Sequence, residues 1–187
     1  GHNSIYTATL LPRTYDLVEP NPVALKDISE IFGNLSIGYT KPNIFPKCLE
    51  DFKGDKLYDV VICEGWLGGI LDYEKSMLVK LSSFVKSGGV MLITFYSPIG
   101  GMATFLRRLL SYRLISHKDP MNKKTSILRK AFASHLNTLS SMNRSHEHWI
   151  QDSILNPHIY VGLLTPHLCN DILSDEFMIY QSVPRFS

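Results

Sequence analysis

Short apolar runs alternate along the chain with segments in which apolar residues recur at helical spacing. The apolar runs predict strands over residues 15–19, 35–39, 57–63 and 90–96, and the run over 57–63 suits a central strand buried on both faces. The helical spacing predicts a short helix before residue 12 and longer helices over 22–32, from 72 to about 86, and from 98 onward. Ser87-Gly88-Gly89 is the expected stop of the helix that begins at 72. This order predicts an α/β fold, a doubly wound, mostly parallel Rossmann-like sheet.

From about residue 113 the pattern becomes wholly helical. Ser145 is the expected cap of one helix in this part, and a longer helix before it carries one apolar stripe: Leu128, Phe132, Leu136 and Leu139. We expect residues 113–158 to form a helical insertion or lid on a core of residues 1–112, with outer-layer helices of the same sheet as the alternative. Residues 159–187 are expected to complete the core with a helix from Thr165-Pro166 and a strand over 176–181.

Glu19 ends the first predicted strand and is followed at once by a helix with Asn21 as its cap and Pro22 at its first position. A carboxylate fixed at the carboxyl end of such a strand can accept both hydroxyls of a ribose. The alternative is an acid that only caps or solvates the turn. Because ligands bind where the strands of an open α/β sheet end, we expect Glu19, Glu64-Gly65-Trp66 and Tyr96-Ser97 along one rim.

Composition narrows the classes of protein. The net charge of +2 is too small to argue for nucleic acid as a partner. No apolar run reaches the roughly 20 residues that span a bilayer, and no signal-peptide pattern opens the sequence. The three cysteines are far apart and form no CxxC, which fits a reducing compartment. These features predict a cytoplasmic protein without a membrane span.

Several segments within residues 1–97 together resemble the class I S-adenosylmethionine-dependent methyltransferases. LeuValGluProAsn matches the place where an acid of that family binds the cofactor's ribose, which implies this role for Glu19, with Asn21 beside it. CysLeuGluAspPhe resembles the acidic stretch near the adenine and implies contacts from Leu49, Glu50 and Asp51.

The resemblance continues around the last two strands of this part. Glu64, Gly65 and Trp66 are expected in the loop after the strand over 57–63, and would face the methionine part of S-adenosylmethionine and the incoming acceptor. LysSerGlyGlyValMetLeuIle, residues 86–93, resembles the family's glycine turn into its fifth strand. The alternative is that Trp66 is a core residue under the helical insertion. The implied cofactor is therefore S-adenosylmethionine, bound along the predicted rim.

The family's glycine-rich loop after the first strand is almost absent. Gly1 stands where the last glycine of that loop would be, and the resemblance implies that it contacts the cofactor. We therefore expect that the sequence begins inside a longer protein, with the first strand and most of the loop upstream. The alternative is that Gly1-His2 is a cloning scar.

The resemblance implies methyl transfer to a small-molecule or sugar-containing acceptor. A base is needed only where the acceptor loses a proton. His148 and Tyr96 are candidates for it, and His117, His146 and His158 also lie on or near the rim. His146 and His148 point to different faces of a helix and no third ligand is evident, so no metal site is expected.

Two other functions remain open. One is a non-catalytic methyltransferase-like scaffold domain, which the missing glycine loop supports. The other is an NAD-binding oxidoreductase domain, since an acid at the end of the second strand binds the ribose there too. Binding of S-adenosylhomocysteine against binding of NAD separates methyl transfer from the oxidoreductase alternative. A Gly-x-Gly after a strand upstream of Gly1 would argue against the scaffold alternative.

Overall fold

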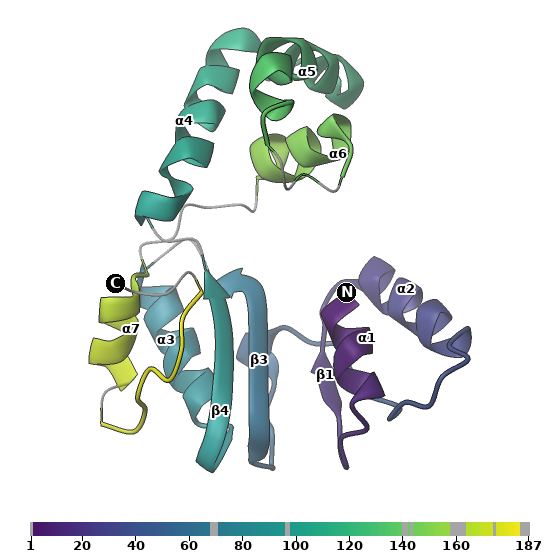
Figure 1. The fold of residues 1–187 in the computed structure, drawn as a ribbon, viewed down its shortest axis with the longest axis vertical. Helices are drawn as coiled ribbons and strands as arrows, with labels where there is room; N and C mark the ends of the chain where they lie inside the picture. The colour runs from purple at the N-terminus through teal and green to yellow at the C-terminus, as the bar shows by residue number, and fades with distance from the viewer. Residues whose placement is uncertain are drawn as a thin grey trace. The chain divides into compact units, whose positions relative to one another are not determined.

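The computed structural model describes residues 2–67, 71–95, 98–139, 142, 144–157, 164–173 and 175–183, without the side chains of His2, Trp66 and Leu71. The chain forms two units, Gly1–Lys56 and Leu57–Ser187. Each unit combines helices with a pair of parallel strands (Figure 1). The α/β class predicted from the sequence is confirmed, although each described sheet has only two strands.

The first unit is built on the parallel strand pair β1·β2. Its elements in chain order are α1 (His2–Thr9), β1 (Asp16–Val18), α2 (Pro22–Gly33), β2 (Asn43–Phe45) and the 3-10 turn η1 (Leu49–Asp51). The register aligns Asp16 with Asn43 and Val18 with Phe45. Ala8, Ile28 and Phe32 form the buried core between the two helices and the strands. The predicted helix over 22–32 is confirmed, with Asn21 as its cap.

The strand predicted over residues 35–39 is wrong. Leu35 and Tyr39 instead pack against the core of the two helices. The Tyr39 hydroxyl donates to the Phe32 carbonyl oxygen over 2.8 Å, and the two rings lie 5.2 Å apart. This contact holds Tyr39 at the end of α2, and the strand that pairs with β1 forms further on, at Asn43–Phe45.

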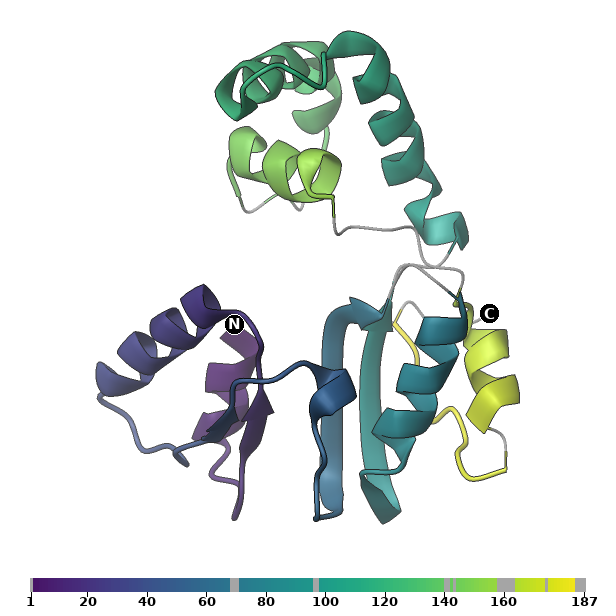
Figure 2. The same cartoon turned by 180° about the vertical axis from the view of Figure 1, so that it is seen from behind.

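The second unit contains the longer strand pair. Its elements here are β3 (Tyr58–Leu67), α3 (Leu71–Ser82), β4 (Val85–Phe95) and, later in the chain, α7 (Pro166–Leu173). Figure 2 shows α3 lying against β4, and α7 packs against α3. The side chains buried in this part include Cys63, Leu67, Met77, Leu78, Leu81 and Phe84.

The opposite face of β3·β4 is apolar and open. Val60 pairs with Val90 and Ile62 pairs with Leu92, so the four side chains form one continuous apolar face. They remain 43–56% exposed. The expectation that residues 57–63 are buried on both faces is therefore wrong: only the face toward α3 is covered by the described residues.

A bulge in β4 replaces the predicted helix stop at Ser87-Gly88-Gly89. The helix α3 already ends at Ser82, and the pairing shifts between Tyr58 and Val60 to absorb extra residues of β4. Gly88 has a φ of +76°, and a Cβ at Gly89 would lie 3.0 Å from the Asp59 carbonyl oxygen. The bulge thus needs glycine for two separate reasons.

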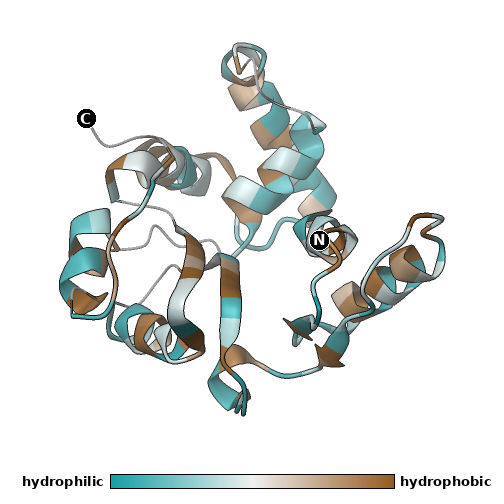
Figure 3. Cartoon of the chain, turned by 60° about the horizontal axis from the view of Figure 1, so that its bottom comes forward, coloured by the Kyte–Doolittle hydropathy of each residue, from teal (hydrophilic) through white to brown (hydrophobic). Residues whose placement is uncertain are grey.

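A group of helices with its own core follows β4. It consists of α4 (Pro98–Leu114), α5 (Met121–Leu136), α6 (His146–Ile150) and η2 (Gln151–Leu155), a π-helical turn. Leu128, Leu136, Ile150 and Ile154 form the buried centre, and Phe132 and Leu139 pack on it as the stripe predicts. Hydrophobic and hydrophilic residues alternate along the helices (Figure 3). The Ser145 cap is confirmed, since its Oγ accepts from the His148 N–H over 3.2 Å.

The helix predicted at Thr165-Pro166 is confirmed as α7, but the strand predicted over 176–181 is wrong. Residues 177–182 have no regular secondary structure. Phe177 is half-buried, whereas Met178 is 83% exposed and Tyr180 is 93% exposed, so most of the apolar run that suggested a strand is not covered by the described residues.

Candidate functional site

Glu19 stands at the carboxyl end of β1, as predicted. Its N–H donates to the Phe45 carbonyl oxygen over 3.1 Å, which continues the β1·β2 ladder by one bond beyond Val18. The half-buried side chain turns back to the chain, and Glu19 Oε1 accepts from the Asn21 N–H over 2.8 Å. Backbone and side chain are therefore both held in place at the end of the strand.

The turn after Glu19 is closed by two side-chain acceptors. Asn21 Oδ1 accepts from the Val23 N–H over 2.9 Å, the bond expected of a helix cap. Among the described residues, no hydrogen bond other than that from Asn21 reaches the Glu19 carboxylate. The two readings of Glu19 are compatible, because one oxygen holds the turn while the other keeps its capacity to accept from a ligand.

The predicted adenine segment lies at the same edge of the first unit. Leu49–Asp51 forms η1 shortly after β2, and β1 and β2 are parallel and in register. The buried Phe52 fixes the end of this turn, since its ring meets that of Phe45 edge-on at 5.0 Å. Glu50 and Asp51 are exposed and Leu49 is half-buried. Glu19 and η1 thus both follow the carboxyl ends of paired strands.

Glu64 and Gly65 lie in a bulged strand end rather than in the predicted loop. The pairing of β3 with β4 shifts between Cys63 and Leu67, and Gly65 has a φ of +67°. The Gly65 N–H donates to Thr94 Oγ1 over 2.8 Å. Sequence reasoning missed Thr94. The available signal is that it is the one polar residue in the apolar run from Val90 to Phe95.

The predicted rim is brought together only in part. Glu19, Asn21 and η1 share the first unit, whereas Glu64 and Gly65 belong to the second. A rim common to both groups stays a prediction. Gly1, the Trp66 side chain, Tyr96, Ser97 and His158 lie outside the described residues.

The candidate bases on the helical group have ordinary surroundings. His148 is exposed on α6, where its N–H bonds to the Ser145 cap. His117 is exposed, and its carbonyl oxygen accepts from Lys124 Nζ over 2.9 Å. Within the described ranges, no three His, Cys, Asp or Glu side chains are placed to share a metal ion.

The buried thiols of the second unit are unreactive. Burial raises the pKa of Cys63 to about 11, and the negative charge of Glu64 adds to the effect. Burial likewise raises the pKa of Cys169 to about 11, with a contribution from the buried Glu74. Both cysteines are therefore protonated at neutral pH and are poor nucleophiles.

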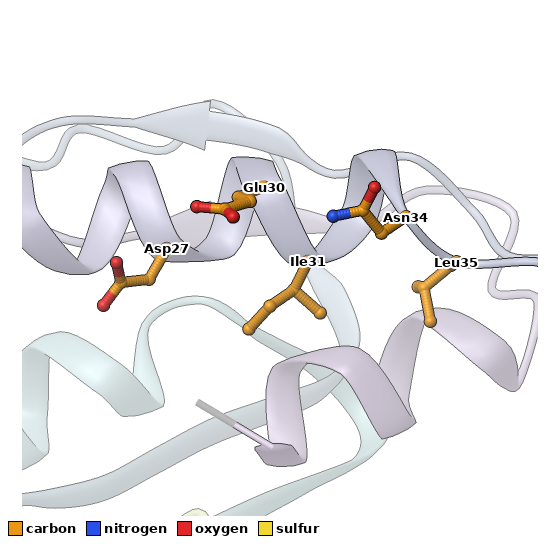
Figure 4. Close-up of a pocket in the computed structure, with 5 residues that line it drawn as sticks. All are labelled: Asp27, Glu30, Ile31, Asn34 and Leu35. Carbon is orange, nitrogen blue, oxygen red and sulfur yellow. The ribbon is translucent and has the colours of Figure 1, made fainter.

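Two surface hollows on the first unit lie beside α2. The first is lined by Asp27, Glu30, Ile31, Asn34 and Leu35, whose side chains Figure 4 shows along the C-terminal half of the helix. The second is lined by Ser29, Phe32, Gly33, Tyr39, Lys41, Pro42 and Ile44. Neither lining includes Glu19, Asn21 or a residue of η1, so these hollows are separate from the candidate site.

None of the helices in the described ranges is both long and apolar enough to cross a membrane.

The fold is similar to that of a known protein, although no protein family matches the chain and no curated protein sequence matches it. Two solved structures of PKMT2 from Rickettsia typhi align with 87% of this chain and 33% of that chain. The structure in complex with AdoHcy has a TM-score of 0.54 at 13% identity. The other has a TM-score of 0.61 at 9% identity. The chain spans about a third of the length of PKMT2 and shares the fold of that part.

Proposed function

We propose that the chain binds S-adenosylmethionine and serves methyl transfer. The observation that carries the proposal is the shared edge of Glu19 and η1, set by the parallel register of β1 and β2. The similarity of fold to a protein solved with AdoHcy supports it, since AdoHcy is what remains of the cofactor after its methyl group has left.

Glu19 is the proposed ribose ligand. Its Oε1 is fixed by the Asn21 N–H, so the carboxylate is oriented before a ligand arrives. Its Oε2 then accepts from a ribose hydroxyl. Leu49 supplies apolar contact to the adenine and Glu50 or Asp51 accepts from its amino group, while Asn21 keeps its role as the cap.

Glu64, Gly65 and Trp66 are proposed to face the methionine end and the acceptor. S-adenosylmethionine supplies a methyl group already activated on a sulfonium, so these residues need only to position the acceptor and exclude water. Gly65 suits a close approach because nothing lies within 4 Å of the place where a Cβ would be. His148 and Tyr96 remain the proposed bases for an acceptor that loses a proton.

The acceptor is proposed to be a small or sugar-containing molecule. The competing acceptor is a protein side chain. Incubation with methyl-labelled S-adenosylmethionine and a cell extract separates the two. Label in the low-molecular-weight fraction supports the first acceptor, and label in the protein fraction supports the second.

Calorimetric titration of the full chain tests the cofactor. We expect S-adenosylhomocysteine to bind more tightly than NAD, and Glu19→Gln to weaken its binding about tenfold or more, since a hydrogen bond to a charged group is lost. Glu30→Gln is the matched control, an exposed acid of the same unit outside the candidate site. Tighter binding of NAD would support the oxidoreductase alternative. Binding of neither ligand would support the scaffold alternative.

A further inference from the structure

The helix α4 carries its apolar side chains on the outside. Most of its large apolar residues are 43–84% exposed, and we call them the apolar stripe: Ile99, Met102, Phe105, Leu106, Leu109, Leu110, Tyr112 and Leu114. They recur at three- and four-residue steps, so they cover one side of the helix. None of the described residues buries this side.

The side of α4 that packs on the other helices is small and polar instead. Gly101 and Ser111 are its buried residues. Arg108 Nη1 donates to the Asn156 carbonyl oxygen over 2.9 Å, just beyond η2. The Arg107 guanidinium lies 5.5 Å from the centre of the Trp149 ring. The helix is therefore amphipathic in the inverse sense, with polar groups toward the bundle and apolar groups toward solvent.

The helical group that bears the stripe is strongly basic. Residues 98–155 contain nine Lys and Arg against three Asp and Glu, a net charge of +6, while the whole chain has +2. The remainder of the chain is accordingly acidic. Arg113 is exposed within the stripe itself, and Lys118 and Lys130 are exposed nearby in the sequence. Positive charge is thus concentrated on the same group of helices as the exposed apolar surface.

We propose that the apolar stripe binds the surface of an anionic lipid bilayer, with α4 lying in the plane of the membrane. A bilayer surface offers both phosphate charge for the basic residues and an apolar layer for the stripe, which is the combination used by interfacial helices. Nucleic acid would match the charge but would leave the apolar side chains in water. The inference does not rest on the proposed methyl transfer.

Sedimentation with lipid vesicles tests the proposal on the full chain. We expect the protein to sediment with vesicles of phosphatidylcholine mixed with phosphatidylserine and to stay in solution with phosphatidylcholine alone. Raised salt weakens the binding, because the attraction between exposed charges is screened. Leu106→Ser removes one apolar side chain from the contact with the bilayer and weakens the binding about tenfold. Removing one charge by Arg113→Gln weakens it roughly fivefold.

Matched controls separate binding from folding. Val79 on α3 is 54% exposed, close to the 56% of Leu106, so Val79→Ser should bind vesicles as the native chain does. Lys26→Gln, an exposed charge on α2, is the control for Arg113→Gln. Circular dichroism should be the same for all four variants.

Three results would overturn the proposal. One is the absence of sedimentation with the anionic vesicles. Another is equal binding by Leu106→Ser and the native chain. The third is a dimer in analytical ultracentrifugation that Leu106→Ser dissociates, because the stripe would then be the contact with a second copy of the chain.

Discussion

The Asn21 N–H donates a hydrogen bond to Glu19 Oε1 over 2.8 Å, so the acid that ends β1 is tied to the residue that caps α2. This bond makes Glu19 part of the turn as well as a candidate ligand. We expect Glu19→Ala to lower the free energy of unfolding by about 1 kcal/mol, because the Asn21 N–H loses its acceptor. Glu19→Gln keeps an oxygen there and should cost less.

Urea denaturation measures both changes. Glu30→Ala serves as the control, since Glu30 is an exposed acid on α2 whose side chain makes no hydrogen bond or ion pair with the described residues. Equal losses for Glu19→Ala and Glu19→Gln would contradict the role of Oε1 in the turn. If Glu19→Gln also lowers the free energy of unfolding, the turn is disturbed in that variant. Weaker cofactor binding is then not assigned to the lost ribose contact alone.

Gly89 is predicted to be the least replaceable glycine of the bulge in β4. A Cβ there would lie 2.9 Å from the Lys86 carbonyl oxygen and 3.0 Å from that of Asp59, and backbone atoms give way only at a cost. We expect Gly89→Ala to destabilise the fold by about 1–3 kcal/mol.

Gly33→Ala is the matched control for that change. Gly33 ends α2 and nothing lies within 4 Å of the position of its Cβ, so alanine there should leave stability unchanged or raise it by about 0.5 kcal/mol. Thermal unfolding followed by circular dichroism compares the two variants. Equal midpoints would show that β4 accommodates the extra methyl group.

The ion pair between Arg129 and Glu147 links α5 to α6 and predicts a dependence on pH. The hydrogen bond from Arg129 lowers the pKa of Glu147 from its ordinary value of 4.5. Because the folded pKa is the lower one, the pair's contribution to stability is present above pH 4.5 and is lost as the pH falls through the folded value.

Titration of Glu147 by NMR checks this prediction. Arg129→Met should return the pKa of Glu147 toward 4.5, and the difference in melting temperature from the native chain should shrink as the solution is acidified. Arg144→Met is the control, since Arg144 pairs with Asp152 over 2.5 Å. A shift of the Glu147 pKa in that control would assign the effect to the general charge of the helical group.

The three cysteines should differ in reactivity. Cys48 is half-buried and Cys63 and Cys169 are buried, with burial raising the pKa of both buried thiols to about 11. We expect one fast reaction with Ellman's reagent in the folded protein and three equivalents after denaturation. Cys48→Ser should remove the fast reaction and Cys63→Ser should leave it. A fast reaction that survives Cys48→Ser would mean that a buried thiol opens readily to solvent.

The buried centre of the helical group predicts a contrast between two leucines. Leu136 is 1% exposed, so Leu136→Ala should destabilise the fold by about 2–5 kcal/mol. Leu110 belongs to the apolar stripe and is 51% exposed, so Leu110→Ala should change stability by less than about 0.5 kcal/mol. Chemical denaturation compares them. A large loss for Leu110→Ala would show that the stripe is covered in solution.

Elements with local signals could be predicted closely from the sequence. The cap at Asn21 and the proline at the first helical position place the start of α2 at Pro22. Ser145 likewise places the start of α6. The helical spacing of apolar residues such as Leu128 and Leu136 predicts α5 and its buried face. In each case the deciding contacts lie within a few residues of one another in the sequence.

Strands were predicted less well because their partners are distant in the chain. Leu35 and Tyr39 pack on helices, and Met178 and Tyr180 stay exposed. The open face of β3·β4 could not be predicted either, since an apolar run looks the same whether one or both of its faces are covered. The bulges at Gly65 and Gly89 depend on register, which no local pattern specifies.

The candidate site was predictable where it depends on one strand pair. Glu19 and η1 share an edge because β1 and β2 are parallel, and parallel pairing follows from the helix between them. Thr94 was missed because its role depends on one hydrogen bond, which its Oγ1 accepts from the Gly65 N–H across the sheet. Such a bond becomes visible only when the register of β3 and β4 is known.

Arg108 has a consequence for the evolution of related chains. In the sequence it reads as one of a row of cations, yet its guanidinium is half-buried and bonds to a backbone carbonyl at the end of η2. Lysine would replace a planar group of donors by a single point charge. We therefore expect position 108 to covary with the residues of the π-helical turn, and to stay arginine in lineages where the neighbouring cations are exchanged for one another.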